Sequence, residues 1–372
     1  MTASYSSPSR PPFALLRASA LLGLLLLGAC GGESATQTPQ QSQVPQGAAP
    51  QDSAAPAPPT VTGPVVVYSS RQEYLIKPLF DRFTQETGIE VQTQTGEEGP
   101  LIARIQAEGE GTFADVFYTV DVGNLWIAAD KGLLRPTQSD LLERDIPEHL
   151  RDPQGRWFGL SVRARTIAYS TERVQPEELS TYEALADPQW KGRLCLRTSR
   201  KVYNMSLVAT MIDRIGEAEA ERVVRGWVDN LATRVFSSDN LLVQAIAAGQ
   251  CDVGIVNSYY LGQEQQRDPN IPVALFWANQ DSSGVHVNIS GAGITTQAKN
   301  PEGAKRLIEW LSTEEPQRMF SELNLEFPAN PAIESVPLVQ SWGDFKPDLI
   351  NVEVAGRLQA DAVRLMDRAD YR

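Results

Sequence analysis

From residue 64 onward, short apolar runs alternate with longer segments in which apolar residues recur every three or four positions. The run 65–68 has the length and composition of a buried strand. The segment 74–87 has the spacing of a helix with one buried face, and it ends at Gly88. The alternation continues through residue 118, and a strand–helix–strand–helix–strand order predicts a parallel sheet covered by helices.

The same criteria place the remaining elements. Strands are expected at 65–68, 89–95, 114–118, 157–169, 194–196, 253–256, 273–277 and 285–294, with another near Val235. Helices are expected at 74–87, 100–108, 122–131, 204–215, 218–231, 240–248, 301–313, 316–323 and 349–367. Together these elements predict an α/β fold.

The stretch 157–169 is long and apolar, interrupted only by Arg163 and Arg165, as expected for a strand that passes from one lobe to another. A chain of 372 residues also exceeds one typical hydrophobic core. We therefore predict two lobes with a hinged cleft between them. Lobe 1 comprises 64–162 and 288–335, and lobe 2 comprises 163–287 and 336–372.

The first 63 residues have a different composition. Two arginines precede the apolar run 18–27, which leads into Leu27-Gly-Ala-Cys30, a sequence that resembles the lipobox of bacterial lipoproteins. We expect a lipoprotein signal peptide over 1–29 and a lipid on the thiol of Cys30. A transmembrane anchor is the weaker alternative because the run is short for a bilayer. The remainder of 30–63 is rich in Gln, Pro, Ala, Ser and Thr, as in a flexible linker.

Charge and motif content narrow the function. The net charge is −13, and no basic cluster suits a nucleic-acid partner. The sequence has no Gly-x-Ser-x-Gly, His-Glu-x-x-His or phosphate-binding glycine-rich motif. Its only histidines are His149 and His286, which leaves few candidates for general-base chemistry. We therefore do not expect an enzyme.

Two cysteines remain besides Cys30. Cys195 and Cys251 lie beside the expected strands 194–196 and 253–256. In an extracytoplasmic compartment, a pair of cysteines favours a disulfide, here between two neighbouring strands. Metal ligation by the two thiols is the alternative.

Three tyrosines follow the same two strands. Tyr259 and Tyr260 come after the strand 253–256, and Tyr203 follows the strand 194–196. The carboxyl ends of strands are where open α/β sheets bind ligands, and the expected disulfide would bring these segments together. Three phenol oxygens suit a hard, highly charged cation such as Fe³⁺, because Mg²⁺ and Ca²⁺ prefer carboxylates and carbonyls. The alternative is that the adjacent tyrosines simply bury their rings.

Eight segments in order resemble the periplasmic ferric-ion-binding proteins of bacterial ABC iron importers, over essentially all of 64–372. They are Tyr68-Ser-Ser-Arg-Gln72, Ala114-Asp-Val-Phe-Tyr-Thr-Val-Asp121, Trp157-Phe-Gly-Leu-Ser-Val-Arg-Ala-Arg165, Asp187-Pro-Gln-Trp-Lys-Gly192, Val202-Tyr-Asn204, Asn257-Ser-Tyr-Tyr260, Val287-Asn-Ile-Ser-Gly291 and Glu326-Phe-Pro328. The resemblance implies a two-lobed periplasmic-binding-protein fold that closes around Fe³⁺ and delivers it to a permease in the inner membrane.

The resemblance also implies roles for individual residues. Tyr203, Tyr259 and Tyr260 match the iron-binding tyrosines of the family. Gln72 stands where many members have a histidine ligand, and Val120 where others have a glutamate. The chain is thus similar to the branch that binds iron with three tyrosines and a synergistic anion such as carbonate.

In that branch the anion would be held by Arg71, Gln72 and Arg163. Asp121, Asn240 and Asn257 are candidates to support the metal ligands, and Tyr74 lies close enough in sequence to reach the vacant histidine position. We expect a monomer in the periplasm or at the cell surface, attached only through its lipid. A binding protein for another solute, such as an oxyanion or a small organic cation, and a lipid-anchored structural protein are the alternatives.

Overall fold

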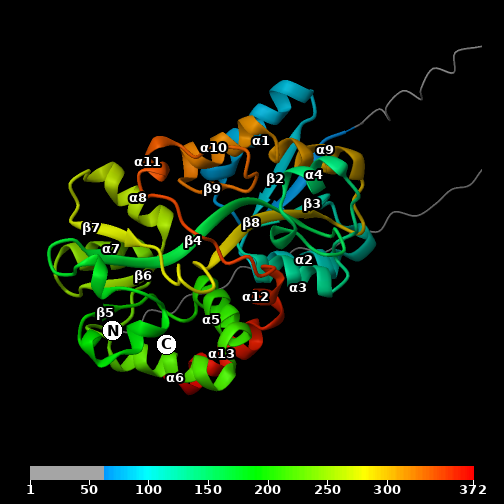
Figure 1. Ribbon diagram of the computed structural model, residues 1–372. Helices are drawn as coiled ribbons and strands as arrows, with labels where there is room; N and C mark the ends of the chain where they lie inside the picture. Colours follow the sequence, from blue (N-terminus) through cyan, green and yellow to red (C-terminus); the bar gives the residue numbers. More distant parts are fainter. Residues whose placement is uncertain (1–62) are drawn as a thin grey trace, which may run out of the picture. The chain divides into compact units, whose positions relative to one another are not determined.

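The computed structural model describes residues 63–372 (Figure 1). The predicted signal peptide, Cys30 and the linker up to residue 62 lie outside the described residues. Among the helices of residues 63–372, none is both long enough and apolar enough to cross a bilayer.

The sheet begins with the predicted alternation of strands and helices. Strand β1 (Val65–Ser69) pairs in parallel with β2 (Val91–Thr95) and with β3 (Val116–Thr119). The helices that connect and follow these strands are α1 (Glu73–Thr87), α2 (Glu98–Glu108) and α3 (Val122–Asp130). Beyond β3 the sheet is mixed, because β8 (Val287–Ile294) runs antiparallel to β3. The expectation of a parallel sheet therefore holds only for the first three strands.

Strand β4 (Phe158–Ser170) joins the two ends of the sheet, whose order is β2-β1-β3-β8-β4-β6-β5 (Figure 1). Its first part, through Ala164, pairs with β8, and its second part pairs with β6 (Val253–Asn257) and β7 (Val273–Phe276). We call the part built on β1, β2, β3 and β8 the β1 half, and the part built on β5, β6 and β7 the β6 half. All 13 residues of β4 are buried, which agrees with the apolar side chains that dominate its sequence.

The β6 half contains the second series of strands and helices. Its elements are β5 (Leu194–Cys195), α5 (Val202–Ile215), α6 (Glu217–Asp229), α7 (Asp239–Ala247), β6 and α8 (Ser258–Arg267). The remaining elements are α4 (Asp140–Asp145), α9 (Pro301–Leu311), α10 (Glu314–Asn324), β9 (Phe327–Pro328), α11 (Pro337–Gln340), α12 (Glu353–Arg357) and α13 (Gln359–Arg368). Helices α12 and α13 both pack against α5, and α12 also packs against α3 (Figure 1).

Two expected elements are wrong in detail. No strand forms near Val235, where Phe236 makes only an isolated bridge with Arg197. The expected helix 349–367 is two helices, because Leu358 leaves the helical conformation between them. Gly356 lies so close to the Trp126 side chain that a Cβ atom would clash with it. The close contact with α3 thus sets the position of α12 separately from that of α13.

The predicted disulfide between Cys195 and Cys251 is present. It joins β5 to a residue two positions before β6, and these two strands pair in parallel. Closing a loop across a sequence separation of 56 residues restricts the unfolded chain. We expect Cys195→Ser with Cys251→Ser to lower the free energy of unfolding by about 4 kcal/mol in denaturant titrations. The same loss should appear when the wild-type protein is reduced, and a loss confined to one of the two conditions would contradict this account.

His286 is a buried histidine whose Nε2 atom has no hydrogen-bond partner within residues 63–372. Burial lowers the pKa of His286 to about 4, against the opposing attraction of Asp348. The unfolded chain therefore takes up this proton near pH 6.5, and the folded protein does so only near pH 4. Stability should fall as the pH drops through this window, by about 3 kcal/mol for the whole interval. Urea titrations should show a flatter dependence on pH for His286→Phe, whereas a parallel curve would contradict this account.

Candidate functional site

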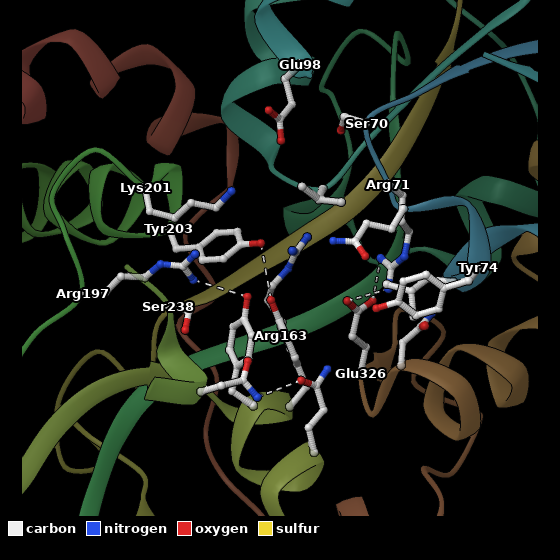
Figure 2. A pocket seen from close by; sticks show the side chains of 18 of the residues that line it. Ser70, Arg71, Tyr74, Glu98, Arg163, Arg197, Lys201, Tyr203, Ser238 and Glu326 are labelled. Atoms are coloured by element: carbon white, nitrogen blue, oxygen red, sulfur yellow. Dashed lines mark hydrogen bonds and ion pairs between the residues drawn. The ribbon is translucent and has the colours of Figure 1, made fainter. Parts of the chain in front are cut away.

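A polar pocket of about 380 Å³ lies between residues of the two halves (Figure 2). From the β1 half it is lined by Ser70, Arg71, Gln72, Tyr74, Leu75, Glu97, Glu98 and Val120. From β4, the β6 half and the later chain it is lined by Arg163, Arg197, Lys201, Tyr203, Ser238, Asn240, Tyr259, Tyr260, Gln263, Asn324 and Glu326. Several of these residues stand at the first turns of α1, α2, α5, α7 and α8, where exposed N–H groups favour negative charge.

The three predicted tyrosines meet on one wall of this pocket. Tyr203 is the second residue of α5, and Tyr259 and Tyr260 are the second and third residues of α8. The Tyr259 hydroxyl donates to the Tyr203 hydroxyl at 3.4 Å, and the rings of Tyr259 and Tyr260 lie 4.3 Å apart. Because β5 and β6 are neighbouring strands, the helices that follow them start side by side. Three phenol oxygens therefore come within reach of one ligand.

Tyr259 and Tyr260 keep their protons when no cation is present. Burial raises the pKa of Tyr259 well above its ordinary value, and the neighbouring phenols Tyr203 and Tyr260 raise it further. Burial and Tyr203 likewise raise the pKa of Tyr260. Ionisation of Tyr259 and Tyr260 near neutral pH therefore requires a strong positive charge bound beside them.

Three basic side chains surround the Tyr203 ring. The guanidinium carbons of Arg163 and Arg197 lie 5.6 and 5.4 Å from the ring centroid, and Lys201 Nζ lies 5.1 Å from it. Arg197 Nη1 also donates to the Tyr260 hydroxyl at 3.3 Å. Arg197 and Lys201 were not predicted as site residues. Their signal in the sequence is the basic stretch that directly precedes Tyr203.

Arg71 is buried and forms an ion pair with Glu326, so it is not on the surface. Its Nη2 and Nη1 atoms donate to the two carboxylate oxygens of Glu326, at 2.9 and 3.2 Å, and Nη1 also donates to Ser290 Oγ. Arg163 Nη2 donates to the same Ser290 hydroxyl at 2.9 Å. No role is predicted for Glu326 from the sequence, because Glu326 and Arg71 are 255 positions apart and no local pattern indicates that they meet.

Of the three residues predicted to support the metal ligands, two lie at the pocket or contact a tyrosine and one does not. Asn257 Nδ2 donates to the Tyr259 hydroxyl at 3.3 Å, and Asn240 lines the pocket and donates to Glu264. Asp121 does not line the pocket. It caps α3 and accepts a hydrogen bond from Ser206, which lies one turn after Tyr203 on α5. Asp121 therefore contacts the tyrosine-bearing helix rather than a tyrosine.

The two remaining candidates both line the pocket. Gln72 precedes the first residue of α1 and has an exposed side chain. Tyr74, on the first turn of α1, is 69% exposed and lines the same pocket as Arg71 and Glu326 (Figure 2). Gln72 thus lies at the pocket rim, as predicted for an anion-binding residue, although its role stays a prediction.

Comparison with known proteins identifies the family. The family described as "Bacterial extracellular solute-binding protein" matches residues 78–347. Iron uptake protein A1 of Synechocystis sp. is 39% identical over 312 residues, covering 82% of this chain and 87% of the relative. Iron uptake protein A2 of the same organism is 41% identical over 314 residues, covering 82% and 89%.

Solved structures agree with the sequence relatives. The structure of Trichodesmium FutA (IdiA) in complex with iron and citrate has a TM-score of 0.80 and 42% identity, covering 83% of this chain and 100% of that one. The ferric binding protein from Campylobacter jejuni has a TM-score of 0.78 and 32% identity, covering 83% and 100%. The predicted two-lobed α/β fold is thus confirmed. The chain belongs to the bacterial extracellular solute-binding proteins, and within them to the group of the iron uptake and ferric-iron-binding proteins.

Proposed function

We propose that this protein captures Fe³⁺ between Tyr203, Tyr259 and Tyr260 and delivers it to an ABC importer in the bacterial inner membrane. The observation that carries the proposal is the meeting of three phenols on one pocket wall, with the hydroxyls of Tyr203 and Tyr259 only 3.4 Å apart. Phenolate oxygens are hard donors that match a trivalent cation. The names of the relatives, which include iron uptake and ferric-binding proteins, agree with this cargo.

The charges around the phenols support a partner anion. Three phenolates would balance the charge of one Fe³⁺ ion. Arg197 is paired with Asp239 at 3.6 Å and Arg163 is attracted by Glu326, whereas Lys201, beside the Tyr203 ring, has no carboxylate partner within residues 63–372. An anion that contacts both the metal and this lysine would offset its charge. Carbonate has the size for such a bridge, and citrate, which accompanies iron in the Trichodesmium structure, is the second candidate.

Of the predicted anion-binding residues, Arg163 and Gln72 fit this role best. Arg71 already donates to Glu326 and Ser290, so its contribution in our proposal is to hold Glu326 at the pocket edge. In this scheme metal and anion bind first to the tyrosine-bearing wall. Closure of the cleft then brings the β1 half over the ion, driven by the tighter binding of the metal to the closed form.

The same proposal covers location and mode of action. A member of an extracellular solute-binding family with periplasmic relatives would work in the periplasm, tethered through a lipid on Cys30 and acting as a monomer. It would act by binding and release, without turnover. The permease would recognise the closed form.

A visible-spectrum titration tests the proposal. Purified protein stripped of metal is titrated with chelated Fe³⁺, in separate series with bicarbonate, with citrate and with neither anion. We expect a phenolate-to-iron charge-transfer band that saturates at one equivalent and is stronger with the partner anion. If no band forms in any series, the ligand is another solute and the proposal is wrong.

A further inference from the structure

The pocket wall that faces the tyrosines offers few oxygen ligands. Hard cations bind about six oxygen atoms, so three phenols leave positions open toward the β1 half. On that side, Leu75 and Val120 are apolar, and the Ser70 hydroxyl donates to Thr119. Gln72 presents a neutral amide, and the phenol of Tyr74 belongs to a side chain that is 69% exposed. The remaining anionic candidates on this side are carboxylates.

Three carboxylates line the pocket, and their surroundings differ. Glu326 is fully engaged, since its oxygens accept hydrogen bonds from Arg71 and from Ser161. Glu97 and Glu98 form no ion pair or side-chain hydrogen bond within residues 63–372. Glu97 is exposed, whereas Glu98 is half-buried. Figure 2 shows the Glu98 carboxylate directed toward the middle of the pocket, facing the side from which Tyr203 projects.

The position of Glu98 suits a ligand that joins the two halves. It is the first residue of α2, so its backbone is held by a helix of the β1 half. Its side chain is half-buried and lines the pocket that also holds Tyr203. An acidic side chain with no partner within residues 63–372, in a pocket also lined by Arg163, Arg197 and Lys201, is an available anionic donor.

We propose that Glu98 is a further metal ligand, which binds the ferric ion from the β1 half when the cleft closes over Tyr203, Tyr259 and Tyr260. This inference rests on the proposed function and adds the residue that couples binding to closure. Phenolates on one wall capture the ion, and a carboxylate on the opposite wall holds the two halves together through it. The closed form thereby gains a metal–oxygen bond that the open form lacks, which is the differential affinity that closure requires.

The test compares Glu98→Gln with Glu97→Gln in the full chain. Both substitutions remove one negative charge from adjacent residues, but Glu97 is exposed, whereas Glu98 is half-buried with its carboxylate directed toward the middle of the pocket (Figure 2). Ferric nitrilotriacetate is the iron source, and affinity is measured by competition with the free chelator. Glu98→Gln should weaken Fe³⁺ binding by at least about tenfold and shift the charge-transfer band to longer wavelength. Glu97→Gln should change affinity by no more than about twofold and leave the band in place.

Small-angle scattering gives a second readout that a structural role would not move. Iron should compact the wild type and Glu97→Gln more than it compacts Glu98→Gln. Wild-type affinity, band and compaction in Glu98→Gln would overturn the inference, as would equal weakening in both variants, which would indicate a general charge effect. Failure of the proposed function is distinguishable, because the wild type itself would then show no charge-transfer band.

Discussion

Replacing Tyr259 and Tyr260 together by phenylalanine should abolish the ferric charge-transfer band and weaken Fe³⁺ binding by much more than about 100-fold. Changes to residues that merely support a metal ligand cost about 10–100-fold in affinity, and this variant removes two ligands at once. The hydrogen bonds it removes are long, at 3.3 Å from Asn257 to Tyr259, 3.4 Å from Tyr259 to Tyr203 and 3.3 Å from Arg197 to Tyr260. The aromatic rings stay in place, so the fold should be retained.

Tyr169→Phe provides the matched control. Tyr169 lies on β4 beside β6 and β7 and is not among the residues that line the pocket. The substitution removes one phenol hydroxyl from the same sheet. The Fe³⁺ affinity and the charge-transfer band of Tyr169→Phe should therefore match those of the wild type. Circular dichroism and thermal melts establish that each variant is folded. A folded double variant with unchanged affinity would show that the phenols are not the metal ligands.

Replacing Glu326 by glutamine should destabilise the protein by about 3 kcal/mol, because it leaves a buried guanidinium without its counter-charge. Arg71 and Glu326 are both almost completely buried, and two hydrogen bonds join them. Burial pushes the pKa of Glu326 upward, but the charges of Arg71 and Arg163 outweigh it and hold this pKa below its ordinary value. The carboxylate is therefore ionised in the folded protein and compensates two arginines.

Urea titrations of four proteins test this interaction as a double-mutant cycle: the wild type, Glu326→Gln, Arg71→Met and the double variant. The interaction energy should be about 2 kcal/mol, so the double variant loses less than the two single changes added together. Asp81→Asn is the surface control, because the pair between Lys77 and Asp81 is about half exposed and should contribute less than about 1 kcal/mol. An interaction energy near zero at Glu326 would contradict a coupled buried pair.

The sequence was informative wherever one local pattern decides the outcome. The three parallel strands, the long strand β4 and the helices ending at glycines followed from periodicity and capping residues. The disulfide followed from two cysteines beside strands that both precede tyrosines, and its presence explains why Tyr203 and Tyr259 meet. The assignment of lobe boundaries and of ligand roles stays a prediction, because these depend on motion and on the metal.

The contacts around the tyrosines could not be predicted from local sequence patterns. Arg71 is predicted to bind the anion, and in the structure its guanidinium forms a buried ion pair with Glu326. Asp121 was expected near the metal ligands, and it contacts α5 through Ser206. Both contacts join residues at least 85 positions apart, and no periodic pattern encodes such a distance.

By itself, then, the sequence determined the α/β class, the order of elements, the disulfide and the three tyrosines at the ends of two strands. Each of these features depends on residues that are neighbours in the chain or that lie on one sheet edge. Only the tertiary structure decided which charges surround those tyrosines. Arg163, Arg197, Lys201, Glu98 and Glu326 come from separate elements, and their positions relative to one another are set by how β4 and the helix N-termini pack. The electrostatic character of the pocket is a property of that packing.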